Sequence, residues 1–178
     1  MNKEKNNDEN SNNYSTIIAI VIAAVVFVAA YLVYVNYLTP TIHYINGVEV
    51  VGNGNINAQF NSIFSSKNIT VGLVAQNLTD NTLTCPSFTL AKASIVLASL
   101  GKNVTAIGML SNNTCVDSKN NTIACTHASL IVGTGSCDCI KLDSANNQVV
   151  VSGSQSWLCT YADKIANTLG YELNNNGN

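Results

Sequence analysis

One stretch near the start of the chain limits what the rest can be. Residues 17–33, "IIAIVIAAVVFVAAYLV", contain no charge, proline or glycine, and the uncharged run continues to residue 38. A helix rises about 1.5 Å per residue, so some 20 residues cross a hydrocarbon core of about 30 Å. Every face of this helix is apolar, unlike that of a helix lying on a membrane surface. The sequence predicts a transmembrane helix over residues 16–38, with the lipid bilayer as its partner.

The basic residues indicate the orientation of this helix. Lys3 and Lys5 precede the span, and no lysine or arginine follows it until Lys67. Because cytoplasmic flanks carry the excess of lysine and arginine, we expect the N-terminus in the cytoplasm. A cleaved secretory signal is the alternative, and it would also place the following domain outside. The sequence therefore predicts a single-pass protein of the cell membrane, held by an uncleaved signal anchor, with an extracytoplasmic C-terminal domain.

Changes in composition divide the chain further. Both ends are polar and rich in asparagine, and we expect them to be disordered. The predicted parts are a cytoplasmic tail (1–15), the anchor (16–38), a hairpin and linker (39–67), an ectodomain (68–173) and a short tail (174–178).

All six cysteines follow the predicted span. An even number of cysteines on the exported side is typical of disulfides. The disulfide candidates are Cys85, Cys115, Cys125, Cys137, Cys139 and Cys159. Five N-x-[ST] sequons accompany them, which makes the ectodomain a candidate glycoprotein. The glycosylation candidates are Asn68, Asn77, Asn103, Asn112 and Asn120.

The apolar pattern of the ectodomain predicts an α/β fold. Asn46-Gly47 between two runs of β-forming residues indicates a hairpin. Four apolar strands are predicted over 69–75, 103–110, 128–133 and 148–153, with helices over 86–101 and 155–169. Gly101 and Gly170 are the expected helix stops. Such strands with intervening helices favour a small, mostly parallel sheet, as in a flavodoxin-like or Rossmann-like layer. With only two clear helices, one face of the sheet is poorly covered or used for contact.

In a parallel sheet the positions of the cysteines follow the carboxyl ends of the strands, so we expect all six cysteines to gather along one edge. Cys115 and Cys125 flank a short excursion, and we expect them to pair. The other four cysteines allow three connectivities. We expect Cys137 and Cys139 to take different partners, because a three-residue ring is strained.

Other chemistry fits the cysteines less well. Zinc sites favour C-x₂-C pairs, which are missing, and His127 stands alone. Thiol redox chemistry at Cys85 remains an alternative, because a helix N-terminus would lower the pKa of a free thiol there. "GTGS" (133–136) lacks the phosphate-loop signatures, and "SGSQSW" lacks a nucleophile elbow, so Ser154 or Ser156 is expected to cap a helix. We predict no catalytic, cofactor-binding or metal residue.

Charge excludes one class of function. The net charge is −2, and all eight basic residues are lysine. Nucleic-acid binding needs a clustered basic face, so no nucleic-acid partner is expected.

Several short motifs together resemble those of small membrane-anchored archaeal surface proteins. They are the anchor, "YINGVEV", "NTCVDSKNNTIAC" and "QVVVSG" followed by "YADKIANTLGY". The "ASLIVGTGSCDCIKL" portion is similar to α/β domains of archaeal surface-layer proteins. The resemblance implies an exported surface domain and brings no catalytic residues. We expect a non-enzymatic module that binds or scaffolds an envelope protein partner. The alternatives are an envelope thiol–disulfide oxidoreductase using Cys85, or small-ligand binding at the carboxyl edge of the sheet.

Overall fold

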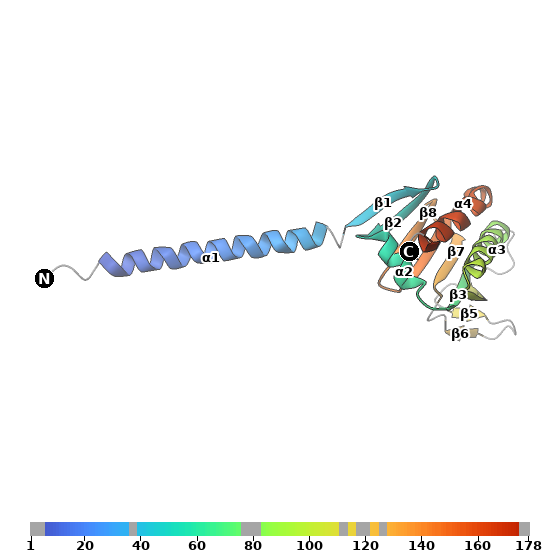
Figure 1. Ribbon diagram of the computed structural model, residues 1–178, viewed down its shortest axis with the longest axis horizontal. Helices are drawn as coiled ribbons and strands as arrows, with labels where there is room; N and C mark the ends of the chain where they lie inside the picture. The colour runs from blue at the N-terminus through green and yellow to red at the C-terminus, as the bar shows by residue number, and fades with distance from the viewer. Residues whose placement is uncertain are drawn as a thin grey trace. The chain divides into compact units, whose positions relative to one another are not determined.

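The computed structural model describes residues 6–35, 39–75, 83–110, 114–116, 122–124 and 128–174. The chain divides into two compact units, and the boundary in the sequence lies between Thr39 and Pro40. The first unit is a long helix and the second is a mixed α/β globule (Figure 1).

Helix α1 spans Asn6–Val33. Its segment Thr16–Val33 is long and apolar enough to cross a membrane, and none of it is buried. The helix begins ten residues before this segment, so the backbone of residues 6–15 is helical where we expected a disordered tail. The physical reason is cooperativity: once the apolar segment has formed a helix, each added residue gains a hydrogen bond without a new nucleation cost.

The globule is built on one mixed sheet of seven longer strands and two three-residue strands, in the order β1-β2-β8-β9-β7-β3-β4-β5-β6. Its strands are β1 (Pro40–Ile45), β2 (Val48–Asn53), β3 (Asn68–Ala75), β4 (Asn103–Leu110), β5 (Thr114–Val116), β6 (Thr122–Ala124), β7 (Leu130–Thr134), β8 (Cys139–Asp143) and β9 (Gln148–Gly153).

The sheet is mixed. Antiparallel pairs lie at β8–β9 in its interior, at β1–β2 at one end, and at β4–β5 and β5–β6 at the other end. The four predicted strands, now β3, β4, β7 and β9, are parallel, which confirms the expected core of the sheet. Strand β8, which we did not predict, returns antiparallel to β9, and β2 joins β8 in parallel. We call the side where β3, β4, β7 and β9 end the carboxyl edge; β8 and β2 begin there.

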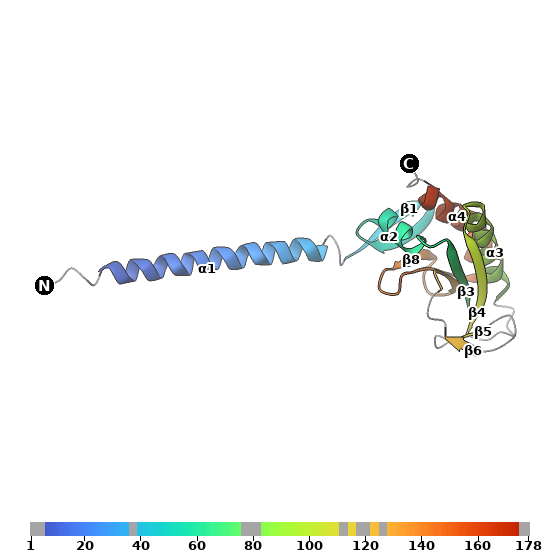
Figure 2. The same cartoon turned by 60° about the horizontal axis from the view of Figure 1, so that its bottom comes forward.

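Three helices pack on one face of this sheet, as Figures 1 and 2 show for α3 and α4. They are α2 (Ile56–Ile63), α3 (Thr84–Ser99) and α4 (Gln155–Asn174). Their apolar side chains form one core with Val71, Val132 and Val151 of the central strands. Flavodoxin-like and Rossmann-like folds carry helices on both faces, and this layering is not found in the part of the chain that the structure describes. The expectation that one face lacks helix cover agrees with this arrangement.

The predicted hairpin is confirmed as β1 and β2. Asn46 and Gly47 have φ angles of 53° and 76°, as a two-residue hairpin turn requires. Helix α2 was missed, because asparagine and glycine dominate the stretch around it. Asn55 nevertheless caps this helix by accepting a hydrogen bond from the Ala58 N–H at 3.1 Å.

The C-terminal helix does not stop at Gly170. Helix α4 continues to Asn174, so the predicted stop is wrong. A Cβ at Gly170 would lie 2.7 Å from Cγ1 of Val96 on α3. The glycine is therefore needed for the close approach of two helices, whereas Gly101, with φ of +77°, does end α3 as expected.

Candidate functional site

Four of the six cysteines lie at the carboxyl edge, where we expected all six. Cys85 lies in the first turn of α3 and Cys159 near the start of α4. Cys137 lies between β7 and β8, and Cys139 is the first residue of β8. The described backbone places Cys115 in β5, next to β4. Cys125 and His127 lie outside the described residues, so the expected Cys115–Cys125 pair stays a prediction.

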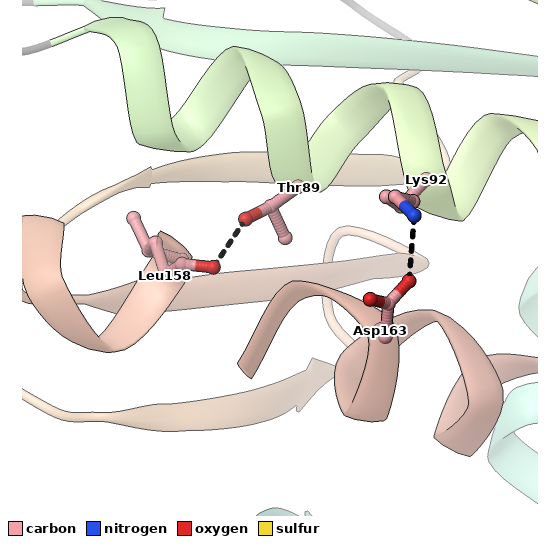
Figure 3. A network of polar contacts seen from close by, with 4 residues as sticks. All are labelled: Thr89, Lys92, Leu158 and Asp163. Carbon is pink, nitrogen blue, oxygen red and sulfur yellow. Dashed lines mark hydrogen bonds and ion pairs between the residues drawn. The ribbon is translucent and has the colours of Figure 1, made fainter. Parts of the chain in front are cut away.

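A disulfide between Cys85 and Cys159 joins the two longest helices of the globule, with Cα atoms 4.8 Å apart. Beside it, the buried Thr89 hydroxyl donates to the Leu158 carbonyl at 2.8 Å. One turn further along, Lys92 and Asp163 form an ion pair at 2.8 Å (Figure 3). The figure shows the hydrogen bond and the ion pair bridging α3 and α4. The disulfide therefore anchors a helix pair that is also held by a buried hydrogen bond.

The second described disulfide joins Cys137 to Cys139, two residues apart. We expected these cysteines to take different partners, and that prediction is wrong. The backbone leaves β7, reverses and enters β8 within this segment, which brings the two Cα atoms to 5.3 Å, inside the usual range for a disulfide. With these sulfurs and those of Cys85 and Cys159 in disulfides, none of the four supplies the thiolate that a zinc site requires.

The disulfide brackets Asp138, whose carboxylate accepts a hydrogen bond from the Ser154 N–H at 2.7 Å. Ser154 in turn accepts from the Trp157 N–H at 3.3 Å, which confirms its predicted capping role. The Gly135 N–H donates to the Gly153 carbonyl at 3.1 Å. "GTGSCDC" therefore packs against the start of α4 and caps it, rather than cradling a phosphate.

Aromatic side chains continue from this cap along α4. Trp157 stacks on Tyr161 with ring centroids 5.8 Å apart, and the ammonium of Lys164 lies 4.8 Å from the centroid of Tyr161. A Cβ at Gly153 would lie 2.3 Å from the Trp157 ring, so the indole packs directly on the end of β9. Trp157 is therefore a packing residue.

Two of the sequon asparagines lie together at the opposite edge of the sheet. Asn68 and Asn103 are exposed first residues of β3 and β4, and the Asn103 amide donates to the Asn68 oxygen at 2.9 Å. Exposure makes both accessible to a modifying enzyme. Asn77, Asn112 and Asn120 lie outside the described residues.

The face of the sheet without helices carries a row of side chains that the sequence did not reveal. Strand pairing places seven residues opposite one another across seven strands, and we call them the helix-free row. They are Ile42, Val51, Lys141, Val150, Ile131, Gly72 and Ile107. Alternation along each strand hides such a row, because it becomes visible only when the register of all strands is known.

The helix-free row is exposed at its β1 end and buried where it crosses β7. Ile42 is 58% exposed and Lys141 is exposed, whereas Ile131 is 7% exposed and packs with Ala128, Val74 and Ile107. The accessible part is therefore the half formed by β1, β2, β8 and β9.

A hollow of about 240 Å³ adjoins the open half of the row. Its lining includes Pro40, Val51, Asn53, Lys141 and Asp143. The side-chain amide of Asn146 donates to the Asp143 carboxylate at 2.8 Å and is the main cause of a lowered pKa there. The hollow is large enough for one side chain of a partner, and it presents an ammonium and a carboxylate at its rim.

Beside the row, at the outer strand, Tyr44 is 73% exposed. Its hydroxyl donates to Glu49 at 3.1 Å, and this hydrogen bond to a carboxylate raises the pKa of the tyrosine. The open half of the helix-free row, the hollow and Tyr44 together form the candidate functional site, which we call the open face.

Comparison of the chain with protein-family models, curated proteins and solved structures finds no match. The resemblance to archaeal surface proteins therefore stays a prediction.

Proposed function

We propose that the chain is a single-pass membrane protein whose extracytoplasmic globule binds or scaffolds an envelope protein and catalyses no reaction. The observation that carries this proposal is the open face, a sheet surface with exposed side chains that none of the globule's described helices covers. Small-molecule sites are concave and mostly enclosed. A broad sheet surface with one shallow hollow instead suits a macromolecular partner.

The proposed location draws on both units of the chain. Segment Thr16–Val33 has the length and apolar character of a membrane span. The Cys85–Cys159 disulfide is of the kind that persists in oxidising compartments. The lysines before the span favour a cytoplasmic N-terminus, and the exposed sequon residues Asn68 and Asn103 fit a globule on the other side of the membrane.

The chemistry of the open face favours protein over lipid or nucleic acid. Ile42, Val51 and Val150 supply apolar contact. Lys141 supplies a positive charge, and Asp143 and Glu49 supply negative charges. This composition resembles the mixture of apolar centre and polar rim that protein interfaces use. Anionic lipid or nucleic acid would require a surplus of positive charge.

A photo-cross-linker placed at Lys141 in the full-length, membrane-embedded chain tests the proposal. In intact cells we expect one discrete adduct with another envelope protein, and we expect Val51→Asp to abolish it. The control position is Ile95, which is 67% exposed on α3 and lies away from the open face. Equal labelling at both positions, or an adduct that survives Val51→Asp, would contradict the proposal.

Thiol–disulfide exchange is a second candidate, favoured by the exposure of Cys159. A thiolate of a partner dithiol would attack the Cys159 sulfur, forming a mixed disulfide and releasing Cys85 as a thiolate. The N-terminus of α3 would stabilise that thiolate. The second thiolate of the partner would then attack the partner's own sulfur in the mixed disulfide. This step forms a disulfide within the partner and releases Cys159, so that both cysteines of this chain are left reduced. No comparable observation favours small-ligand binding at the carboxyl edge.

Incubating the full chain with a peptide dithiol tests the second candidate. Exchange predicts that peptide thiols disappear in step with the appearance of alkylatable Cys85 and Cys159. A Cys137→Ser, Cys139→Ser double variant serves as the control, because it retains the Cys85–Cys159 disulfide. If Cys85 and Cys159 stay bonded while the peptide remains reduced, the chain is not an oxidoreductase of this kind.

A further inference from the structure

Strand β1 forms one edge of the sheet. It pairs with β2 through six consecutive residues, and no described strand pairs with its outer side. An edge strand carries backbone N–H and C=O groups that a further strand can bind. The edge at β1 is therefore a docking position defined by the backbone.

The sequence of β1 lacks most of the devices that keep edge strands from pairing. Natural edges are usually protected by lysine, by bulges, by inward charges or by proline. "PTIHYI" has no lysine or acidic residue, its register with β2 is unbroken, and its one proline is the first residue. Ile42 and Tyr44 instead present large side chains that are 58% and 73% exposed. The edge is suited to pairing rather than protected from it.

We infer that β1 pairs antiparallel with β1 of a second copy of this chain, joining two sheets into one. The register follows from geometry. Residues opposite each other in an antiparallel pair share a face of the sheet. If both open faces are to lie on the same side, even-numbered residues of one β1 must therefore lie opposite even-numbered residues of the other, and odd-numbered opposite odd-numbered. Centring the two-fold axis on Ile42 would bring Pro40, which has no N–H, into the ladder. Centring it on His43 uses residues 41–45 only.

The His43-centred register has a chemical consequence on each face. Ile42 of each copy lies opposite Tyr44 of the other, so four exposed side chains form two aromatic–aliphatic cross-strand pairs. Thr41 lies opposite Ile45 and His43 lies opposite its own counterpart. The two open faces become one continuous surface across the two-fold axis.

The membrane supplies the reason for choosing a second copy as the occupant. One strand from each copy buries less than the roughly 1,200 Å² that stable interfaces need. Strand β1 begins at Pro40, seven residues after α1 ends at Val33. Copies anchored in one membrane are confined to the same plane. This confinement raises their effective concentration for one another, so that a weak contact can form. In this respect the inference rests on the proposed function, and it deepens that function by naming one partner.

Disulfide trapping in membranes containing the full chain tests the register. His43→Cys places two cysteines directly opposite each other, within the distance that a disulfide spans. The matched control is Thr41→Cys, on the same strand and face, whose counterpart would lie about 13 Å away along the strand. Mild oxidation should give about tenfold more dimer for His43→Cys than for Thr41→Cys. Equal yields, or efficient trapping through Ile42→Cys, would overturn the inference.

A second pair of variants tests the side-chain contacts. Adding Tyr44→Lys to His43→Cys should remove most of the trapped dimer, because a solvated charge replaces the ring opposite Ile42. Adding Ile95→Lys, at a 67% exposed position on α3, should leave the yield unchanged. Dimer that is insensitive to Tyr44→Lys would overturn the pairing.

One more readout separates this inference from the proposed function. A membrane-impermeant maleimide applied to intact, unoxidised cells reports on which side of the membrane the cysteine of His43→Cys lies. Labelling without trapping overturns the dimer and leaves the proposed location intact. Labelling only after lysis overturns the extracytoplasmic location, whatever the dimer yield.

Discussion

Asp138 lies between two cysteines that bond to each other, and its carboxylate accepts the Ser154 N–H at the start of α4. A helix N-terminus leaves backbone N–H groups without partners and carries a partial positive charge. A carboxylate at this position satisfies a donor and interacts favourably with that charge. Cys137–Cys139 confines the loop that carries Asp138, so the short disulfide stabilises the start of the helix.

Replacing Asp138 should therefore weaken the globule. Asp138→Ala should lower the free energy of unfolding by about 1 kcal/mol, the usual cost of losing a helix cap. The control is Asp163→Ala, which breaks an exposed ion pair with Lys92 and should cost no more than about 0.5 kcal/mol. Denaturant titration of the chain in detergent measures both, and equal losses would contradict a capping role.

Glu172 makes stability depend on pH. Its side chain is only 3% exposed in α4, and burial raises the pKa of its carboxyl, partly opposed by the charge of His43. The folded state thus holds this proton more tightly than the unfolded state. The stability it contributes is complete below the ordinary carboxyl pKa and is lost as pH rises through the raised pKa.

Glu172→Gln should remove that dependence. The free energy of unfolding should then fall less between acidic and neutral pH than in the unaltered chain, and the variant should be more stable at neutral pH. Unfolding at a series of pH values checks this, and unchanged pH profiles would contradict the assignment.

The helices, strands and turns that the sequence predicted are those determined by residues close together in the chain. The Asn46-Gly47 turn, the apolar runs of β3, β4, β7 and β9, and the stop of α3 at Gly101 all follow from short-range physics. Helix α2 has Ile56, Phe60 and Ile63 buried at helical spacing, a signal that was present but outweighed by the surrounding asparagines.

Other features depend on partners far along the chain and could not be read from local patterns. Strand β8 is only five residues long, and β9 on one side and β2 on the other determine its role. The choice of face for the helices and the partner of Cys85 are likewise set by tertiary packing. The helix-free row of the candidate site needs the register of seven strands, so only the general expectation of an uncovered face was accessible from the sequence.

The close approach of α4 to α3 at Gly170 predicts that Gly170→Ala lowers the stability of the globule, although helix propensity alone would predict an increase. Alanine is the better helix former by about 1 kcal/mol, but its Cβ would lie 2.7 Å from Cγ1 of Val96. Overpacking of this kind costs about 1–3 kcal/mol, so Gly170→Ala should destabilise the globule. Adding Val96→Ala should recover much of the loss, and a stabilising Gly170→Ala would show that the helices are not so closely packed.

The two described disulfides should differ in their contribution to stability. Cys85–Cys159 spans 74 residues, and the chain-entropy relation gives it about 4 kcal/mol. The same relation gives a two-residue separation less than about 2 kcal/mol. A Cys85→Ser, Cys159→Ser variant should therefore unfold at clearly lower denaturant than a Cys137→Ser, Cys139→Ser variant. The reverse order would show that the short ring is the more important restraint.

For the whole molecule, the proposal of a membrane-tethered globule depends on Thr16–Val33, which has the apolar length of a span and is not buried. A helix of this kind that is not covered by protein needs lipid or another apolar surface around it. The Pro40–Asn178 unit has its own core and its own sheet. The two units should therefore separate when the chain is cut between them.

Alkaline carbonate extraction tests this separation. The full chain should stay in the membrane pellet, whereas cleavage at a protease site inserted after residue 38 should release the globule in a soluble, folded form that keeps Cys85–Cys159. Ile22→Lys, Val26→Lys is a milder control that should loosen membrane retention without changing the globule. Extraction of the unaltered chain by carbonate would contradict a transmembrane anchor.

The pairing of β2 with β8 joins Glu49 to Cys139, some ninety residues later in the chain. A polypeptide threaded through a translocation channel from its N-terminal end would deliver β1 and β2 long before β8 emerges. Until then the hairpin has no neighbour on its inner side, and long-range pairing of this kind slows folding. If the globule is exported as proposed, each new molecule passes through a period in which both borders of the hairpin lack a neighbouring strand.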